Sequence, residues 1–277
     1  MNLILQSLHS IAPDRLAAIS ELTQAGGMDT LTPNCVRLNR ASPHPALAAY
    51  CLEHAIDYGF VPAERHIGDF GLLVMDMDST LINIECIDEI ADMHGLKPQV
   101  AEITEAAMRG EMEFAESLQR RVALLAGLDE IALTRVYEER LRLNRGAEIM
   151  LNTLRQKNIK TLLVSGGFTL FTERLKNQLG LDFAHSNTLE IVNGKLTGKV
   201  LGKIVDAQGK ADWLNRTRES LGLRPEQVIA MGDGANDLKM MAVAGISVAY
   251  HAKPIVQQQA GYALNYVGLD GLLPLLG

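Results

Sequence analysis

The stretch Leu72-Leu-Val-Met-Asp-Met-Asp-Ser-Thr80 decides the fold that this sequence predicts. Its first four residues are apolar, and acidic and hydroxyl side chains follow at once. A short, continuous apolar run is typical of a strand buried on both faces, as in a parallel sheet covered by helices. Because such sheets bind ligands beyond the carboxyl ends of their strands, residues 76–80 are candidate functional residues.

Three further apolar runs, at residues 161–164, 228–231 and 246–249, have the same character. Helical stretches separate them, so we predict an α/β fold with a doubly wound, Rossmann-like parallel sheet as its core. Two of the runs lead directly into polar, glycine-rich clusters, Ser165-Gly-Gly167 and Gly232-Asp-Gly-Ala-Asn-Asp237. We therefore expect three chemical clusters to converge in one cleft at the carboxyl ends of the strands.

Two insertions interrupt this pattern. About eighty residues separate the first two strands, far more than one crossover helix needs, and residues 87–143 have a helical pattern. We predict an inserted helical cap, a common means of excluding water from a cleft. Residues 189–200 predict a β-hairpin, in which Asn193-Gly194 supplies the two positive φ angles of a type I′ turn.

Residues 1–70 predict a small α/β module in front of this core. The expected strands are residues 3–5, 35–38 and 60–63, and the expected helices are residues 13–24 and 45–58. Residues 66–71 have the composition of a linker. The predicted division is a module at 1–70, a catalytic core at 71–85 and 144–277, and a cap at 86–143.

Composition excludes several classes of protein. With 26 basic against 33 acidic residues the net charge is −7, which argues against a nucleic-acid partner but not against a small phosphorylated one. The longest apolar run, residues 240–250, is shorter than the ~20 residues that a membrane span needs, so we expect no membrane partner. The first residues lack the pattern of a signal peptide. Three scattered cysteines without a CxxC pair favour a reducing cytoplasm.

Asp76 and Asp78 end the first strand two residues apart, so both carboxylates can face the same side. Two close carboxylates cannot both ionise freely, which provides a nucleophile and a separate acid–base group unless a cation neutralises the pair. Together with Asp233 and Asn236 they form an all-oxygen set suited to Mg²⁺. The alternatives are a solvated turn for the first cluster and an Asp/Gly turn that caps a helix for the second.

Ser165-Gly-Gly167 offers a hydroxyl and free backbone N–H groups at an expected helix start, which would suit a phosphate, although an ordinary N-cap explains it as well. Lys210 opens the helix expected at residues 211–221. A surface lysine is the default interpretation. A site that holds several carboxylates and receives a phosphate dianion nevertheless needs a cation at its rim.

Arg121 is the most informative residue of the expected cap. On a helix that begins near Glu113, it shares an apolar face with Phe114, Leu118 and Leu125. A guanidinium on that face costs free energy unless it meets an anion. The anion is either a structural carboxylate or a carboxylate or phosphate of the substrate.

Together these residues resemble the phosphoserine phosphatase family of the haloacid dehalogenase-like hydrolase superfamily. The four superfamily motifs occur in order over about 200 residues, as Asp76-Met-Asp-Ser-Thr80, Ser165-Gly-Gly167, Lys210 and Gly232-Asp-Gly-Ala-Asn-Asp237. In the cap, Glu85 and the run from Met108 through Phe114 to Arg121 are similar to the family's substrate-recognition segment.

The resemblance implies hydrolysis of O-phospho-L-serine to serine and phosphate, the last step of serine biosynthesis, through an aspartyl-phosphate. It implies that Asp76 is the nucleophile, that Asp78 is the acid and then the base, and that one Mg²⁺ binds Asp76, Asp233 and the Asp78 carbonyl oxygen. The implied phosphate-binding residues are Ser165, Gly166, Lys210 and Asn236, with Asp237 in support. In the cap, the implied contacts are Glu85 to the ammonium group, Arg121 to the carboxylate, and Met108 and Phe114 to the cap side of the substrate.

Other interpretations remain open. A phospho-accepting receiver domain would lack the second aspartate and the cap, and a non-catalytic amino-acid sensor would bind serine without releasing phosphate. A related capped phosphatase or phosphotransferase would act on another small phosphomonoester. The module at residues 1–70 resembles a ligand-binding module of the ACT type, and a role in packing or in a homodimer fits its residues equally well.

Overall fold

The computed structural model of the chain describes residues 1–109 and 111–277, with the side chain of Met108 also left undescribed. It forms two compact units. The first contains Met1–Leu72, Asn144–Ile159 and Pro225–Gly277, and the second contains Leu73–Leu143 and Lys160–Arg224. Both are α/β in character. No helix in the described part of the chain is long and apolar enough to span a bilayer.

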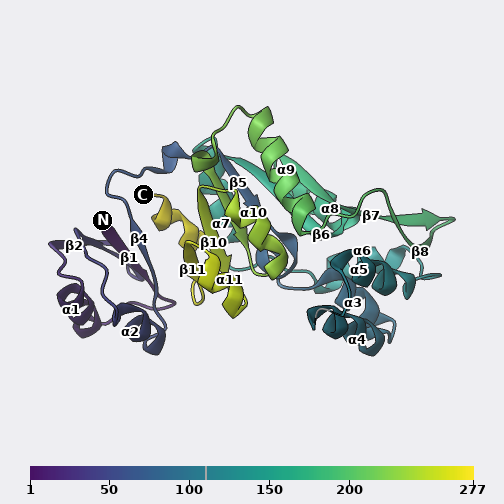
Figure 1. Cartoon of the computed structure of the whole chain (residues 1–277), viewed down its shortest axis with the longest axis horizontal. Coiled ribbons are helices and arrows are strands. Elements are labelled where there is room, and N and C mark those ends of the chain that lie inside the picture. The colour runs from purple at the N-terminus through teal and green to yellow at the C-terminus, as the bar shows by residue number, and fades with distance from the viewer. Residues whose placement is uncertain (110) are drawn as a thin grey trace. The chain divides into compact units, whose positions relative to one another are not determined.

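The first unit begins with a four-stranded antiparallel sheet, which together with two helices is called the N-terminal module below. Its strand order is β2-β3-β1-β4. Alternate residues of the strands, such as Leu3 and Leu38, pack in one core with Ile19 and Leu47 of the helices, so both helices cover the same face (Figure 1). The elements are β1 (Asn2–Gln6), α1 (Pro13–Leu22), β2 (Gly27–Thr32), β3 (Cys35–Asn39), α2 (Leu47–Glu53) and β4 (Asp57–Val61).

Two sequence predictions for the module are wrong in detail. The helix expected to reach residue 58 ends at Glu53, because Ala55 adopts a positive φ of 53° that breaks the helix. The last strand therefore starts earlier than expected, at Asp57. The sequence also did not predict β2, whose six residues are all exposed and carry no apolar alternation.

The remainder of the first unit is a parallel sheet with flanking helices. Its strands follow the order β11-β10-β9, and Ile246 pairs with Ile229 while Val248 pairs with Tyr262. Two of these strands coincide with apolar runs that predicted buried strands. The elements are α7 (Ala147–Gln156), β9 (Val228–Gly232), α10 (Leu238–Ala242), β10 (Ile246–Tyr250), α11 (Pro254–Gln259), β11 (Tyr262–Leu264) and the 3₁₀ helix η6 (Leu269–Leu276).

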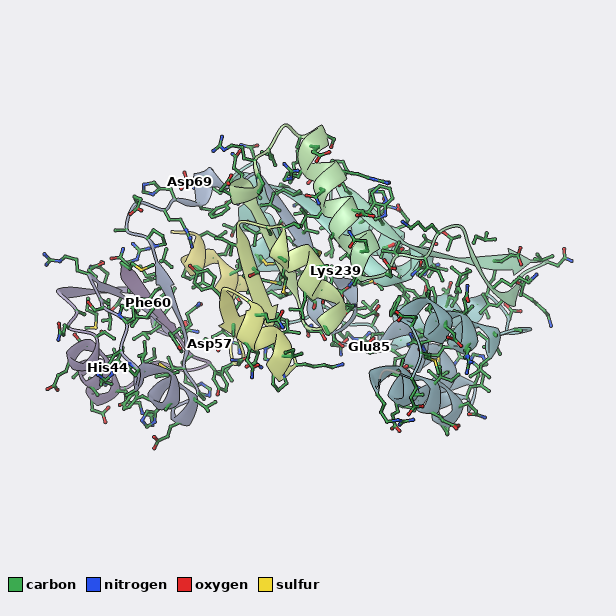
Figure 2. All side chains as sticks on the ribbon, in the orientation of Figure 1. His44, Asp57, Phe60, Asp69, Glu85 and Lys239 are labelled. Carbon is green, nitrogen blue, oxygen red and sulfur yellow. The ribbon has the colours of Figure 1, made fainter. Side chains whose placement is uncertain are left out.

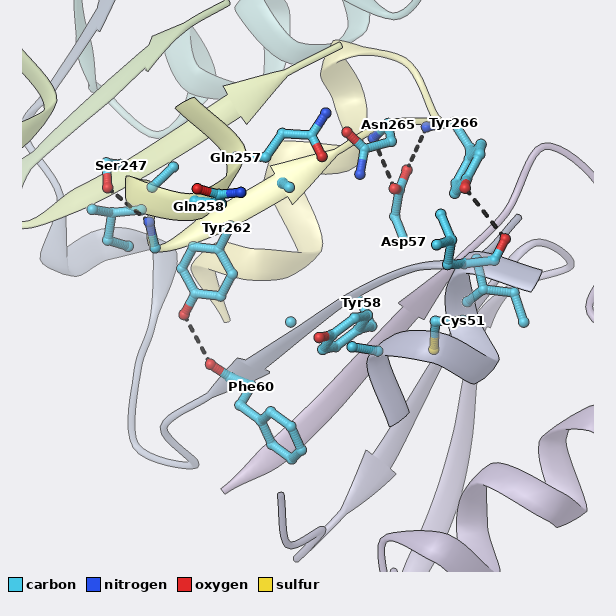
Figure 3. Close-up of a pocket in the computed structure, with 18 of the residues that line it drawn as sticks. Cys51, Asp57, Tyr58, Phe60, Ser247, Gln257, Gln258, Tyr262, Asn265 and Tyr266 are labelled. Carbon is cyan, nitrogen blue, oxygen red and sulfur yellow. Dashed lines mark hydrogen bonds between the residues drawn. The ribbon is translucent and has the colours of Figure 1, made fainter. Parts of the chain in front are cut away.

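Buried polar contacts join the N-terminal module to these C-terminal elements. The Asp57 carboxylate, 2 % exposed, accepts backbone N–H bonds from Asn265 and Tyr266 at 2.7 and 2.9 Å (Figure 3). It also accepts the Val267 N–H at 2.9 Å. Tyr262 Oη donates to the Phe60 carbonyl at 2.9 Å. A cavity of about 760 Å³ lies between β4 and α2 on one side and β11 and α11 on the other. The labelled positions of Asp57 and Phe60 in Figure 2 mark this junction.

The second unit contains the other strands in the order β5-β6-β7-β8. The strands β6 and β7 are parallel, whereas β7 and β8 are antiparallel. The predicted hairpin is confirmed, since Asn193 and Gly194 have φ angles of 51° and 76°. The elements are β5 (Leu72–Met75), β6 (Lys160–Phe168), α8 (Thr169–Leu179), β7 (Phe183–Val192), β8 (Lys195–Leu201) and α9 (Ala207–Ser220).

The predicted helical insertion is confirmed as a set of short helices, called the cap helices below (Figure 1). They contact the hairpin, because Leu196 exchanges backbone hydrogen bonds with Gly127 and Leu128 at 2.8 and 2.9 Å. The domain boundaries drawn from the sequence stay a prediction. The helices are α3 (Cys86–Met93), α4 (Lys97–Met108), α5 (Phe114–Ala123), α6 (Ile131–Arg135) and the π-helical turn η3 (Val136–Arg140).

Candidate active site

Asp76 follows β5 directly and forms a buried ion pair. Its Oδ1 lies 2.7 Å from Lys210 Nζ, and the two side chains are 7 % and 1 % exposed. The same oxygen accepts the Met77 N–H at 2.7 Å. Removing either partner would deprive the other buried charge of this ion pair, which costs several kcal/mol. The ion pair therefore fixes the Asp76 carboxylate at the end of the strand.

Lys210 reaches Asp76 from the first turn of α9. The helix starts at Ala207, earlier than expected, because Asp206 is its N-cap and accepts the Gly209 N–H at 2.7 Å. Lys210 N–H donates to the Asp206 carbonyl at 2.9 Å. The default interpretation of a surface lysine is wrong, since Lys210 is among the most deeply buried side chains.

Asp78 lies two residues beyond Asp76 and is held by neutral donors. Its Oδ1 accepts the Cys86 N–H at 2.9 Å, and its Oδ2 accepts the Ser165 hydroxyl at 3.3 Å. Burial raises the pKa of the Asp78 carboxyl, although the hydrogen bonds from Cys86 and the charge of Lys210 act in the opposite direction. A carboxyl whose pKa is raised by burial is suited to carry and donate a proton.

Ser165-Gly-Gly167 lies on an irregular end of β6 rather than at a helix start. The helix α8 begins only at Thr169, and its N-cap position is Phe168, so Ser165 is not the N-cap that the sequence left as an alternative. Ser165 Oγ accepts the Gly167 N–H at 2.8 Å. A Cβ at position 167 would lie 2.7 Å from Asp78 Oδ2, so only glycine permits this approach.

Phe114 is placed beside this loop by the first turn of α5. A Cβ on Gly166 would lie 2.9 Å from Phe114 Cζ, so the ring covers Gly166 directly. The cap helix α5 thus contacts the Ser165–Gly167 loop, which lies in the same unit. Met108, the other predicted cap contact, lies at the end of α4, and its side chain is outside the described residues.

Arg121 lies on the partly buried face of α5, as the sequence predicted. Its Nε donates to the Ser117 carbonyl at 3.3 Å. Burial lowers the pKa of its guanidinium, whereas the charges of Asp88, Glu85 and Asp78 raise it. Among the described residues, no carboxylate is close enough to form an ion pair with it, so the structural ion pair that the sequence left open is not formed.

Glu85 precedes α3 and is exposed (Figure 2). Its Oε1 accepts the Ser79 hydroxyl at 2.6 Å, and Ser79 has a positive φ of 55°. The sequence analysis missed Asp88, one turn further along α3, whose pKa is raised by burial and lowered by the charge of Arg121. The available signal was its position in the first turn of the helix that follows Glu85.

The acidic loop after β9 belongs to the first unit. Asp237 is fully buried, and its Oδ2 accepts the Gly234 N–H at 3.1 Å. Asn236 Oδ1 lies over Gly234, where a Cβ would come within 2.1 Å of it. Asp233 is half-buried, and its carbonyl accepts the Lys253 N–H at 3.1 Å. Glycine is thus required at position 234 by the close approach of Asn236, a side chain that the sequence named as a candidate.

Within the second unit, the structure brings together most of the predicted catalytic residues. Asp76 pairs with Lys210, and Asp78 pairs with Ser165, while Phe114 lies against the loop. The sequence treated Cys86 as a small hydrophobe, yet its backbone N–H holds Asp78. No sequence signal distinguished that cysteine from the two in the N-terminal module.

Comparisons with known proteins identify the family of the chain. Residues 70–245 match the family of haloacid dehalogenase-like hydrolases. The chain is 54 % identical over 215 residues to a phosphoserine phosphatase of Polaromonas sp. strain JS666, a match that covers 76 % of this chain and 91 % of that protein.

Two solved structures cover nearly the whole chain. The unliganded probable phosphoserine phosphatase of Vibrio cholerae superimposes with a TM-score of 0.87 at 40 % identity, covering 99 % of this chain and 85 % of that one. A HAD family hydrolase of Salmonella enterica serovar Typhi has a TM-score of 0.90 at 32 % identity, with 99 % and 97 % covered. The chain therefore belongs to the haloacid dehalogenase-like hydrolases and, within them, to the phosphoserine phosphatases.

Proposed function

We propose that the chain hydrolyses O-phospho-L-serine to serine and phosphate, as the last step of serine biosynthesis, with Asp76 as nucleophile and Asp78 as acid and base. The observation that carries this proposal is the fixed Asp76 carboxylate, paired with Lys210 at 2.7 Å, two residues before a carboxyl with a raised pKa. Asp76 is held in place for attack by its ion pair with Lys210, and burial makes proton uptake by the Asp78 carboxyl easier than in water.

The reaction proceeds in two displacements. An Asp76 oxygen attacks phosphorus while the bond to the serine oxygen breaks, and the Asp78 carboxyl gives its proton to that oxygen. The Asp78 carboxylate then takes a proton from water, which attacks the aspartyl-phosphate and releases phosphate. Since an alkoxide is a poor leaving group, the first step depends on the proton of Asp78. The covalent intermediate divides one difficult displacement into two easier ones.

We propose that one Mg²⁺ is held by Asp76, Asp233 and the Asp78 carbonyl oxygen. Asp76, Asp233 and Asp237 are carboxylates that could hold a metal ion, and the set contains only oxygen donors, which suits a hard cation. When bound, Mg²⁺ neutralises the charge that a phosphate dianion and an anionic nucleophile bring together. Asp237 is the supporting carboxylate in this proposal.

The phosphate is bound by Lys210, Ser165, the Gly166 backbone and Asn236 in this proposal. The Lys210 ammonium balances negative charge at Asp76, and its burial strengthens that attraction. The close contact between Phe114 and Gly166 keeps water away from the loop. These groups would stabilise the charge that develops on the phosphoryl oxygens.

The cap helices provide recognition of the amino acid. Arg121 binds the substrate carboxylate, since its half-buried guanidinium has no ion-pair partner among the described residues, and Glu85 binds the ammonium group. Phe114 and Met108 contact the cap side of the substrate. This assignment predicts selectivity for a zwitterionic phosphomonoester.

Phosphate release measured across phosphoserine, phosphothreonine, phosphoethanolamine and a sugar phosphate tests the proposal. We expect phosphoserine to give the highest kcat/KM, with turnover abolished by chelator and restored by added Mg²⁺. The Asp76→Asn variant should lose turnover, while Asp29→Asn, an exposed aspartate of the N-terminal module, should retain it. Turnover that withstands chelation, or that persists in Asp76→Asn, would contradict the mechanism.

We also propose a reducing cytoplasm as the location, which three free, buried cysteines support. A homodimer stays a prediction, and light scattering of the purified protein measures it directly.

A further inference from the structure

The end of β6 that carries Ser165 loses its register with β7. Val164 pairs with His185, but the next paired residues are Phe168 and Asn187, so β6 advances four residues while β7 advances two. The irregularity releases Ser165, Gly166 and Gly167 from the regular ladder. Such bulges leave backbone groups that need other partners.

Asn187 supplies that partner from the facing strand. Its side chain is 1 % exposed, and its Nδ2 donates to the Gly166 carbonyl at 2.8 Å. Because a peptide group is planar, this bond also fixes the direction of the Gly167 N–H. That N–H donates to Ser165 Oγ at 2.8 Å, and the Ser165 hydroxyl donates to Asp78 Oδ2 at 3.3 Å. A continuous chain of hydrogen bonds therefore leads from Asn187 to the acid–base carboxyl.

The oxygen of the Asn187 side-chain amide holds the segment that leads to Lys210. Asn187 Oδ1 accepts the Val205 N–H at 2.8 Å. Val205 directly precedes Asp206, the N-cap of α9, whose carbonyl accepts the Lys210 N–H at 2.9 Å. The Gly166 carbonyl can only accept and the Val205 N–H can only donate, so these two partners determine the orientation of the Asn187 amide.

We propose that Asn187 is a positioning residue that joins the two phosphate-binding elements, the Ser165–Gly167 loop and the start of α9, at a set separation. The inference rests on the proposed function, in which both elements bind the phosphoryl oxygens. An amide is suited to this place because it donates and accepts through one short, planar group, whereas a carboxylate only accepts and an aliphatic side chain does neither. Both contacts are internal to one unit of the structure.

Two variants of Asn187 distinguish the contributions of the two hydrogen bonds that its side-chain amide makes. Asn187→Ala removes both, while Asn187→Asp keeps the acceptor for Val205 and removes the donor to Gly166. The matched control is Ser186→Ala, which removes the 2.7 Å hydrogen bond between Ser186 and Thr172 from the adjacent position of the same strand. The readouts are kcat and KM for phosphoserine, the dissociation constant of orthophosphate by calorimetry with Mg²⁺ present, and the thermal midpoint.

We expect both Asn187 variants to lower kcat and to weaken orthophosphate binding by about tenfold or more, since a displacement of ~1 Å at a reacting group can cost about a hundredfold in rate. The Ser186→Ala control should keep kcat and the dissociation constant of orthophosphate within about twofold of the wild-type values. If Asn187→Ala fails to fold, the isosteric Asn187→Asp variant provides the measurement.

An unchanged affinity of folded Asn187→Asp for orthophosphate would overturn the proposal. A fall in kcat that is fully explained by a smaller folded fraction would overturn it as well. A wild-type protein that binds orthophosphate but does not hydrolyse phosphoserine would contradict the proposed function instead. In that case the orthophosphate comparison still decides the role of Asn187.

Discussion

At the scale of single residues, the local chemistry of Arg121 carries the substrate assignment. Its spacing along the sequence predicted a half-buried cation, and the structure places it on that face without an ion pair among the described residues. Its neighbour Arg120 is exposed and pairs with Glu116 at 2.6 Å, one turn earlier on α5. The two arginines therefore form a matched pair for mutation.

We predict that Arg121→Ala raises the KM for phosphoserine by roughly tenfold to a hundredfold, because a charge-assisted contact with the carboxylate is lost. The effect on phosphoethanolamine, which has no carboxylate, should be less than about threefold. Arg121→Lys should restore only part of the loss, since an ammonium cannot form the bidentate pair. Steady-state kinetics on both substrates measure this.

Arg120→Ala is the control and should leave both substrates unaffected, because exposed pairs of this kind contribute little. Equal losses on phosphoserine and phosphoethanolamine would remove Arg121 from carboxylate recognition.

At the scale of elements, the sequence predicted strands better than the irregularities within them. The apolar runs at β5, β6, β9 and β10 are confirmed, because continuous burial gives a clear pattern. The sequence predicts a helix start at Ser165–Gly167, where the structure has a bulge, because a Ser-Gly-Gly cluster is compatible with both structures. Asn187 had no signal at all, because its role depends on two partners that are distant in sequence.

The start of β6 is joined to the turn before β7 by Asp182, and this contact predicts a pH-dependent stability. Asp182 accepts hydrogen bonds from Lys160 Nζ at 2.7 Å and from Thr161 N–H at 3.0 Å. Partial burial acts to raise the pKa of Asp182, but these donors outweigh it and the pKa is lowered. A lowered pKa stabilises the fold above the unfolded value of ~3.9, and the contribution is lost as the pH falls through the folded value.

We therefore predict that Asp182→Asn lowers the free energy of unfolding by about 1 kcal/mol at pH 7, a small effect because Lys160 is half exposed. The difference from wild type should shrink as the pH falls below ~4. Urea unfolding across this range measures it, with the exposed Glu173→Gln as control. A difference that stays constant with pH would show that the Asp182 charge is not involved.

At the scale of the whole molecule, the N-terminal module is tied to C-terminal elements of the same unit. The pattern of strands and helices in residues 1–70 predicted a small α/β unit but did not indicate what it contacts. The structure shows that the buried Asp57 carboxylate joins the module to the segment that follows β11. Such a junction could not be predicted, since it pairs one aspartate with backbone groups about 208 residues away.

If the module acts by packing, then breaking this junction should affect stability and not catalysis. Asp57→Ala leaves three backbone N–H groups without their acceptor, so we expect a loss of about 3 kcal/mol and a thermal midpoint lower by roughly 5–10 °C. The value of kcat at 25 °C should change less than about twofold, because Asp57 belongs to neither phosphate-binding element. The control is Asp29→Ala, which removes an exposed hydrogen bond to Asn39 within the same module and should leave both quantities unchanged. A large fall in kcat with the thermal midpoint preserved would mean instead that the junction transmits a signal to the catalytic residues, and the module would then be regulatory.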